Sequence, residues 1–158
     1  MKNKSLGALF LITAVVGMVA LFGGYFTGPN VSPMYQEIQK PSWAPPGWLF
    51  GPVWTLLYIL IAFAGWRVWL AKSSQSIRMP MVLYILQLVL NGLWTLIYFE
   101  LQMPWLAFCE ITALFFLILA CMKTFWSLSR SASLSMAPYA LWVGFAMILN
   151  FSIARMNP

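Results

Sequence analysis

Side chains able to carry out acid–base, nucleophilic or metal chemistry are scarce in this 158-residue sequence. It has no histidine, three acidic residues and two cysteines, which excludes a histidine-ligated metal and leaves too few ligands for any other ordinary metal site. Cys109 and Cys121 are twelve residues apart in one apolar segment, about 18 Å along a straight helix. They are therefore too distant for a disulfide and are expected to be buried as small hydrophobes. Without a nucleophile–base pair or paired carboxylates, hydrolytic chemistry has no support.

Glu110 is the one acidic residue well inside an apolar segment. Counted from Trp105, it lies about 8 Å into that segment by the helical rise. A carboxyl group at such a depth indicates a functional site by default. The alternative is a neutral glutamic acid that forms a hydrogen bond with a neighbouring helix.

Aromatic and amide side chains recur at helical spacing in three other apolar segments. One face carries Gln87, Asn91, Trp94, Thr95 and Tyr98, a second carries Trp142, Ala146 and Asn150, and a third carries Trp54 and Tyr58. An unpaired amide facing lipid costs on the order of several kcal/mol, so these faces are predicted to point into a bundle. Small Ala146, between Trp142 and Asn150, would leave a gap that something could fill. For each polar residue, an interhelical hydrogen bond is the alternative.

The composition indicates the elements that hold these residues. The chain is 62% hydrophobic and 8% charged, too apolar for a soluble domain, so we predict an all-α integral membrane protein. Five segments have about the 20 residues that a membrane span needs. They are residues 6–26, 48–70, 81–101, 105–125 and 135–154, joined as a single five-helix membrane domain over residues 1–158. A long loop at residues 27–47 follows the first helix, and short later connections predict antiparallel neighbours.

Basic residues predict the orientation of the five spans. One side of the membrane would hold Lys2, Lys4, Arg67, Lys72, Arg78, Lys123 and Arg130 without an acidic residue. The other side would hold Lys40, Arg155, Glu37 and Glu100. By the positive-inside rule the amino terminus is cytoplasmic, and the long loop and the carboxyl terminus are extracytoplasmic. Because the basic residues form no stripe, the net charge of +6 does not indicate a nucleic-acid partner.

The long loop and the start of the second helix read KPSWAPPGWLFGPVWTLLY, from Lys40 to Tyr58. Its prolines restrict the chain, so the loop could close as a lid with little loss of entropy. Trp43 and Trp48 are predicted to anchor it at the membrane interface. Trp54 and Tyr58 would continue it downward as the wall of a pocket.

Four blocks of the sequence together resemble the signature of the tryptophan-rich sensory protein family, also called the translocator proteins or peripheral-type benzodiazepine receptors. They are Tyr35 with KPSWAPP at 40–46, PVWTLLY at 52–58, QLVLNGLW at 87–94, and PYALW at 138–142 leading to Leu149 and Asn150. The blocks occur in order along essentially the whole chain. The tyrosine-centred cholesterol motif of animal members is not kept, because residues 149–155 (LNFSIAR) contain no tyrosine.

The resemblance implies a five-helix bundle, usually a homodimer, here in a bacterial cell membrane, whose first loop covers a pocket. The pocket of the family binds porphyrins such as protoporphyrin IX and haem, and synthetic benzodiazepine-site ligands. The porphyrin would be a ligand, with no cofactor required and no metal site. The positions that match the family's pocket are Tyr35, Pro45, Trp54, Tyr58, Gln87, Asn91, Trp94, Thr95, Tyr98, Glu110, Trp142, Ala146 and Asn150.

The leading hypothesis is a membrane tetrapyrrole-binding protein that senses, carries or disposes of porphyrins. Some members of the family are reported to break down protoporphyrin in light, which makes Trp54 and Trp142 candidate catalytic residues in a second hypothesis. A third is a small proton-coupled exporter that uses Glu110, although the chain has no internal repeat.

Overall fold

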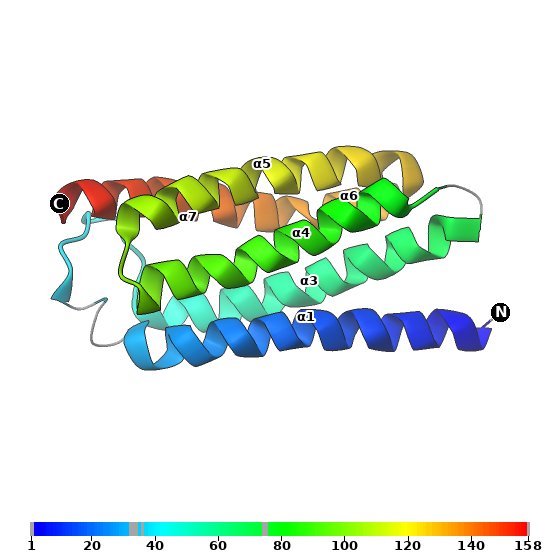
Figure 1. Cartoon of the computed structure of the whole chain (residues 1–158), viewed down its shortest axis with the longest axis horizontal. Helices are drawn as coiled ribbons and strands as arrows, with labels where there is room; N and C mark the ends of the chain where they lie inside the picture. The colour runs from blue at the N-terminus through cyan, green and yellow to red at the C-terminus, as the bar shows by residue number, and fades with distance from the viewer. Residues whose placement is uncertain (1, 32–34, 36, 74–75, 158) are drawn as a thin grey trace.

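The fold is a bundle of long helices. The computed structural model describes residues 2–31, 35, 37–73 and 76–157. Within these residues there are five helices long and apolar enough to cross a membrane, and no strand, as the sequence predicted (Figure 1). Large apolar side chains such as Phe10 and Leu141 are more than three-quarters exposed on the outside of the bundle, where lipid would cover them.

The helices are α1 (Lys2–Val31), α3 (Phe50–Leu70, after a short 3-10 turn at Gly47–Leu49), α4 (Arg78–Thr95), α5 (Pro104–Leu128), α6 (Arg130–Ser135) and α7 (Ala137–Met156). A π-helix at Leu96–Glu100 extends α4, and α6 and α7 together form the last span.

Several helix ends differ from the predicted ones. α1 continues to Val31, five residues beyond the predicted end, so the loop begins later; residues 32–34 and 36 of that loop lie outside the described part of the chain. The last span begins at Arg130 rather than 135, and it is interrupted at Met136. Pro138 explains the interruption, because it has no N–H to donate within a continuous helix and its ring would clash with the preceding turn.

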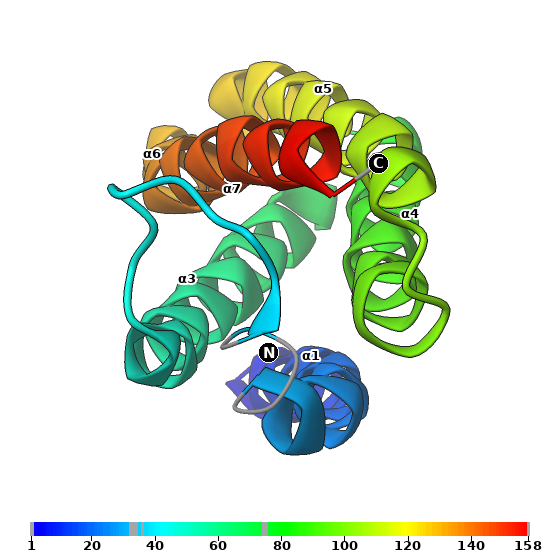
Figure 2. The ribbon, with the colours of Figure 1, turned by 90° about the vertical axis from the view of Figure 1, so that its left-hand side faces the viewer.

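The spans form a ring in the order α1, α3, α6–α7, α5 and α4, which returns to α1 (Figure 2). The prediction that all later helices are antiparallel neighbours is therefore wrong for α3 and α4, which have few contacts with each other. A short connection brings two helices together only at the end that it joins. α1 instead packs against both of them.

Many of the fully buried side chains lie in the half of the bundle remote from the long loop. Ile118, Cys121 and Phe125 of α5 are fully buried there, and the centroid of the Phe125 ring lies 6.2 Å from that of the Tyr84 ring of α4. The Tyr84 ring lies so close to Gly65 that a Cβ at this glycine would come within 2.6 Å of it. Tyr84 also donates a hydrogen bond of 3.0 Å to the backbone carbonyl of Ile61, which ties α4 to α3.

The two cysteines are free and differ in environment. Cys121 is fully buried in the core, as predicted. Cys109 is exposed, so the prediction of a buried side chain is wrong for this residue. The reason is the helical period: Cys109 points away from the face that holds Ala107 and Ile111, both buried.

Candidate ligand-binding cavity

A cavity of about 450 Å³ lies between the helices, toward the end of the bundle that carries the long loop. Its wall is formed by the first half of α3, the last turns of α4, the middle of α5 and α7, and one face of α1. The lining residues are Thr13, Val16, Gly17, Ala20, Gly23, Gly24, Thr27, Phe50, Gly51, Trp54, Thr55, Tyr58, Ile59, Ala62, Asn91, Trp94, Thr95, Phe99, Ile111, Leu114, Trp142, Val143 and Ala146. The wall is thus predominantly apolar and aromatic, as small-molecule sites usually are.

Seven of the predicted site residues lie on this wall: Trp54, Tyr58, Asn91, Trp94, Thr95, Trp142 and Ala146. They come from the three helices whose aromatic and amide faces were predicted to point into the bundle. The structure brings these faces together around one space. That they contact a ligand stays a prediction.

Asn91 is the centre of a hydrogen-bond network that joins three helices. Tyr58 of α3 donates to the Asn91 Oδ1 atom at 2.8 Å, and Asn91 Nδ2 donates to the hydroxyl of Tyr139 in α7 at 3.0 Å. Asn91 is 3% exposed, and Tyr139 is fully buried. The amide of Asn91 therefore forms hydrogen bonds between helices, which was the alternative to a ligand contact. Asn91 also lines the cavity.

Asn150 forms a second network nearer the loop end. Trp94 Nε1 donates to Asn150 Oδ1 at 3.3 Å, and Asn150 Nδ2 donates to the backbone carbonyl of Pro104 at 3.1 Å. The Trp94 indole is also stacked on the Tyr98 ring, with centroids 5.0 Å apart and an angle of 15° between the planes. These contacts fix the orientation of Trp94 on the cavity wall.

The other predicted site residues are not on the wall, namely Tyr35, Pro45, Gln87, Tyr98, Glu110 and Asn150. Gln87 is fully buried one turn from Asn91, and neither atom of its amide has a hydrogen-bond partner among the described residues. Both carboxyl oxygens of Glu110 are likewise buried without a partner in the described part of the chain. The hydrogen-bonded neighbour considered for Glu110 is therefore not found among these residues.

A chain of aromatic rings connects the long loop to the cavity wall. Trp43 of the loop contacts Phe145 with centroids 5.9 Å apart, and Phe145 contacts Trp142 at 5.5 Å. Trp142 contacts Phe50 at 5.9 Å, and Phe50 contacts Tyr35 at 5.6 Å. Trp43 is nevertheless 47% exposed, so its outer edge is available for the membrane interface.

Tyr35 holds the loop against α7. Its hydroxyl donates a 2.8 Å hydrogen bond to the backbone carbonyl of Pro45, and its ring packs beside Leu149 and Ile153 of α7. Burial raises the pKa of Tyr35 above 10.0, so the hydroxyl keeps the proton that it donates. The Lys40 ammonium donates to the backbone carbonyl of Tyr35 and lies 4.7 Å from the centre of its ring.

Asn157 binds the same loop from the end of α7. Its Oδ1 atom accepts a hydrogen bond of 3.1 Å from the backbone N–H of Gln39, and its Nδ2 atom donates to the Gln39 carbonyl at 2.8 Å. The side-chain amide therefore pairs with both backbone groups of one loop residue. The loop lies across the ends of α3 and α7, as Figure 2 shows.

The face of α1 toward the cavity was missed by the sequence analysis. Besides Val16 and Gly23, it contains small residues and threonines at Thr13, Gly17, Ala20, Gly24 and Thr27. Their spacing of four, three, four and three residues places them on one face of a helix. This spacing was a readable signal, but this face of α1 has no aromatic or amide side chain to draw attention to it.

The chemistry available at the cavity is stacking, together with hydrogen-bond donors that include one buried N–H. The indole N–H of Trp142 is buried and has no hydrogen-bond partner within the described residues. No group of three or more His, Cys, Asp or Glu side chains that could hold a metal ion is found in the part of the chain that was described. The arrangement suits a flat, largely apolar molecule that can accept one hydrogen bond.

Comparisons with known proteins extend along most of the chain. A model of the TspO/MBR family matches residues 10–156. The tryptophan-rich protein TspO of Chlorobaculum tepidum is 36% identical over 163 residues, which cover 99% of this chain and 99% of that protein. Protein CrtK of Rhodobacter capsulatus is 35% identical over 89% of this chain and 94% of that protein. The human translocator protein is 34% identical over 78% of this chain and 74% of that protein.

Proposed function

Because the chain belongs to the TspO/MBR family, an integral membrane family, we propose that it binds tetrapyrroles such as protoporphyrin IX and haem. It acts as a sensor, carrier or disposal factor for porphyrins, and benzodiazepine-site ligands enter the same cavity. It works as a homodimer in a bacterial cell membrane, with a cytoplasmic amino terminus and an extracytoplasmic long loop.

The observation that carries this proposal is the wall formed by Trp54, Trp94 and Trp142 around an apolar cavity. A porphyrin is a flat macrocycle with two broad aromatic faces, on which indoles stack. The volume of about 450 Å³ falls within the range of roughly 300–1,000 Å³ typical of small-molecule sites. The free N–H of Trp142 supplies a donor for a porphyrin carboxylate. Since the chain has no histidine, haem binding rests on this packing rather than on an imidazole–iron bond.

A titration of the purified protein with protoporphyrin IX tests the proposal. We expect saturable binding at micromolar concentration, followed by the change in porphyrin fluorescence. Trp54→Leu should weaken binding about three- to tenfold, because it removes one stacking partner. Trp126→Leu is the matched control, since Trp126 is half-exposed and does not line the cavity. Equal losses of affinity in both variants, or no saturable binding, would contradict the proposal.

Light-dependent porphyrin oxidation is a second candidate function, favoured by the position of Trp54 and Trp142 on the same wall. In this reaction excited protoporphyrin would pass its energy to dissolved oxygen, and the indoles would lie beside the activated species. Illumination of the complex should bleach the porphyrin band faster than free pigment under the same light. Trp54→Phe and Trp142→Phe should each slow the bleaching. A rate equal to that of free pigment would rule out this function and leave binding unaffected.

A further inference from the structure

We infer that the cavity exchanges its ligand with the interior of the lipid bilayer, through an opening between α1 and α3. The molecules admitted would be apolar and already dissolved among the acyl chains, and an acyl chain would fill the opening when no ligand is bound. Only the identity of the ligand as a porphyrin, and not the route, rests on the proposed function.

The exposure of the cavity wall is confined to one side. Of the described residues that line the cavity, the exposed ones are Thr13, Gly24, Gly51, Thr55 and Ile59. All of them belong to α1 or α3. The lining residues of α4, α5 and α7 are buried or half-buried. The cavity is therefore closed by three helices and open along the α1–α3 seam.

The opening lies at the depth of the hydrocarbon core. α1 has its apolar span at Ser5–Gly28, and Thr13 is eight residues inside it, about 12 Å by the helical rise. The span of α3 is Gly47–Leu70, and Ile59 is twelve residues inside it, about 18 Å. The hydrocarbon core is about 30 Å thick, so the inner end of the opening reaches its middle. A molecule that leaves here meets acyl chains rather than water.

The rim of the opening includes three glycines beside which the space is open. A Cβ added at Gly17, Gly24 or Gly51 would meet no atom within 4 Å. By contrast, the loop end is covered by the aromatic chain from Tyr35 through Phe50 to Trp142. The path toward the bilayer is thus open while the path toward the aqueous side is occupied by side chains.

A spin label can test the route without any porphyrin. Ala146 lines the cavity on α7, opposite the opening. In the full-length protein with Cys109→Ser and Cys121→Ala, a nitroxide at Ala146→Cys is examined in phosphatidylcholine–phosphatidylglycerol vesicles. We expect frequent collisions with oxygen, which concentrates in the bilayer, and few with a water-soluble nickel chelate. Gly17→Phe, at the rim, should lower the oxygen collision rate at least twofold. Frequent collisions with the nickel chelate would overturn the inference.

Gly7→Phe is the matched control, because an added Cβ at Gly7 also meets nothing within 4 Å while this glycine does not line the cavity. It should leave both collision rates unchanged. An equal effect of the two variants would overturn the inference.

Ligand kinetics supply a second readout that separates the route from the site. In the same vesicles, Gly17→Phe should slow the association of protoporphyrin IX about fivefold and slow its dissociation as well. A raised Kd with an unchanged association rate would show that position 17 contacts the bound ligand and is not an entrance. If protoporphyrin does not bind at all, the proposed function fails, while the spin-label result still decides the route.

Discussion

At the scale of single residues, the buried amides divide into those with partners and those without. Asn91 and Asn150 make hydrogen bonds between helices, while the amide of Gln87 has no partner among the described residues. A buried polar group that loses its partner costs about 1–3 kcal/mol. Asn91 therefore matters to the stability of the bundle independently of any ligand.

The Asn91 network can be tested by a double-mutant cycle with Tyr58. Asn91→Ala should lower the free energy of unfolding in detergent by about 1–3 kcal/mol, because it leaves the hydroxyls of Tyr58 and Tyr139 without this partner. Tyr58→Phe should destabilise the protein less, since it removes one hydroxyl and leaves the ring. The loss of stability in the double variant should be smaller than the sum of the losses in the two single variants, because each single variant removes the same hydrogen bond. Strict additivity would show that the bond contributes nothing to stability.

Glu110 gives a prediction about which side chains contact the ligand. The Glu110 carboxyl is not on the cavity wall, so Glu110→Gln should leave the affinity for protoporphyrin within about twofold of the wild type. Trp54→Leu, on the wall, is the comparison that should lose affinity in the same titration. A Glu110→Gln variant with much weaker binding would place this side chain in contact with the ligand after all.

At the scale of elements, α3 and α4 approach each other where the Tyr84 ring covers Gly65. Gly65→Ala should destabilise the bundle by about 1–3 kcal/mol, because the added Cβ would lie 2.6 Å from the ring. Gly24→Ala in α1 is the matched control, since its Cβ meets no atom within 4 Å. That variant should be neutral, or stabilising by roughly 0.5–1 kcal/mol through helix propensity. Thermal unfolding of the two variants in detergent measures both effects, and equal midpoints would contradict the predicted contact.

The loop is a second element whose position depends on few contacts. Asn157→Ala removes the two hydrogen bonds to the backbone of Gln39, so we expect faster hydrogen exchange at residues 37–46. Ser152→Ala is the control, because Ser152 is on the same helix and bonds only within it. Unchanged exchange in the Asn157 variant would mean that Tyr35 and the aromatic contacts alone hold the loop.

The sequence predicted the number and type of the spans, and seven of the residues that it singled out meet at the cavity. Helical periodicity sufficed for this, because the faces of α3, α4 and α7 each carry aromatic or amide side chains that lipid would not accommodate. The family assignment made from four short blocks is confirmed by the match over residues 10–156.

The order of the helices around the ring could not be predicted in the same way. A short connection limits the distance between two ends only, so nothing in residues 71–77 indicates that α1 packs between α3 and α4. The small-residue face of α1 and the hydrogen bond between Asn157 and Gln39 were also missed. Both depend on which surface each residue meets in the folded chain.

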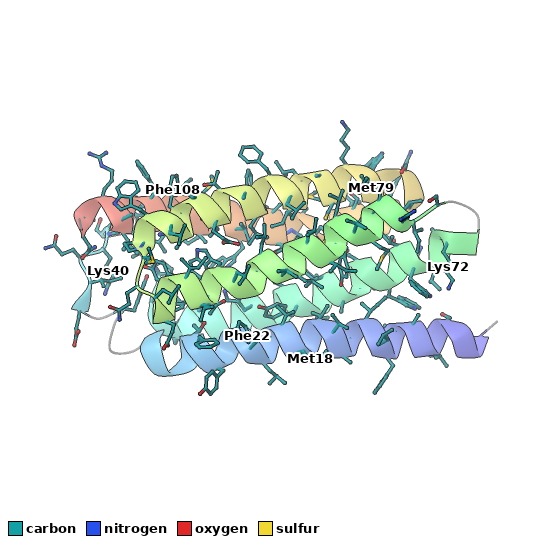
Figure 3. The ribbon with its side chains drawn as sticks, viewed as in Figure 1. Met18, Phe22, Lys40, Lys72, Met79 and Phe108 are labelled. Atoms are coloured by element: carbon teal, nitrogen blue, oxygen red, sulfur yellow. The ribbon has the colours of Figure 1, made fainter. Side chains whose placement is uncertain are left out.

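At the scale of the whole molecule, the charges divide between the two ends. Arg67, Lys72, Arg78, Lys123 and Arg130 lie at or near the helix ends remote from the long loop, and Lys40 and Lys72 mark opposite ends in Figure 3. Alkaline phosphatase fused after the last residue should be active in bacterial cells, because the positive-inside rule places that end outside the cytoplasm. A fusion after Lys72 should be inactive. The reverse pattern would show the opposite orientation.

The bond between Gln39 and Asn157 joins residues 118 positions apart, which has a consequence for the order of events during synthesis. The loop is translated early, yet its partner Asn157 follows the last span. Chains are synthesised at about 5–20 residues per second. Asn157 is therefore made roughly 6–24 seconds after Gln39, which lies 118 positions earlier. During this interval the first two spans can enter the bilayer before the loop has formed its hydrogen bonds to Asn157. The pairing of Gln39 with Asn157 therefore requires that the last span has been synthesised and inserted.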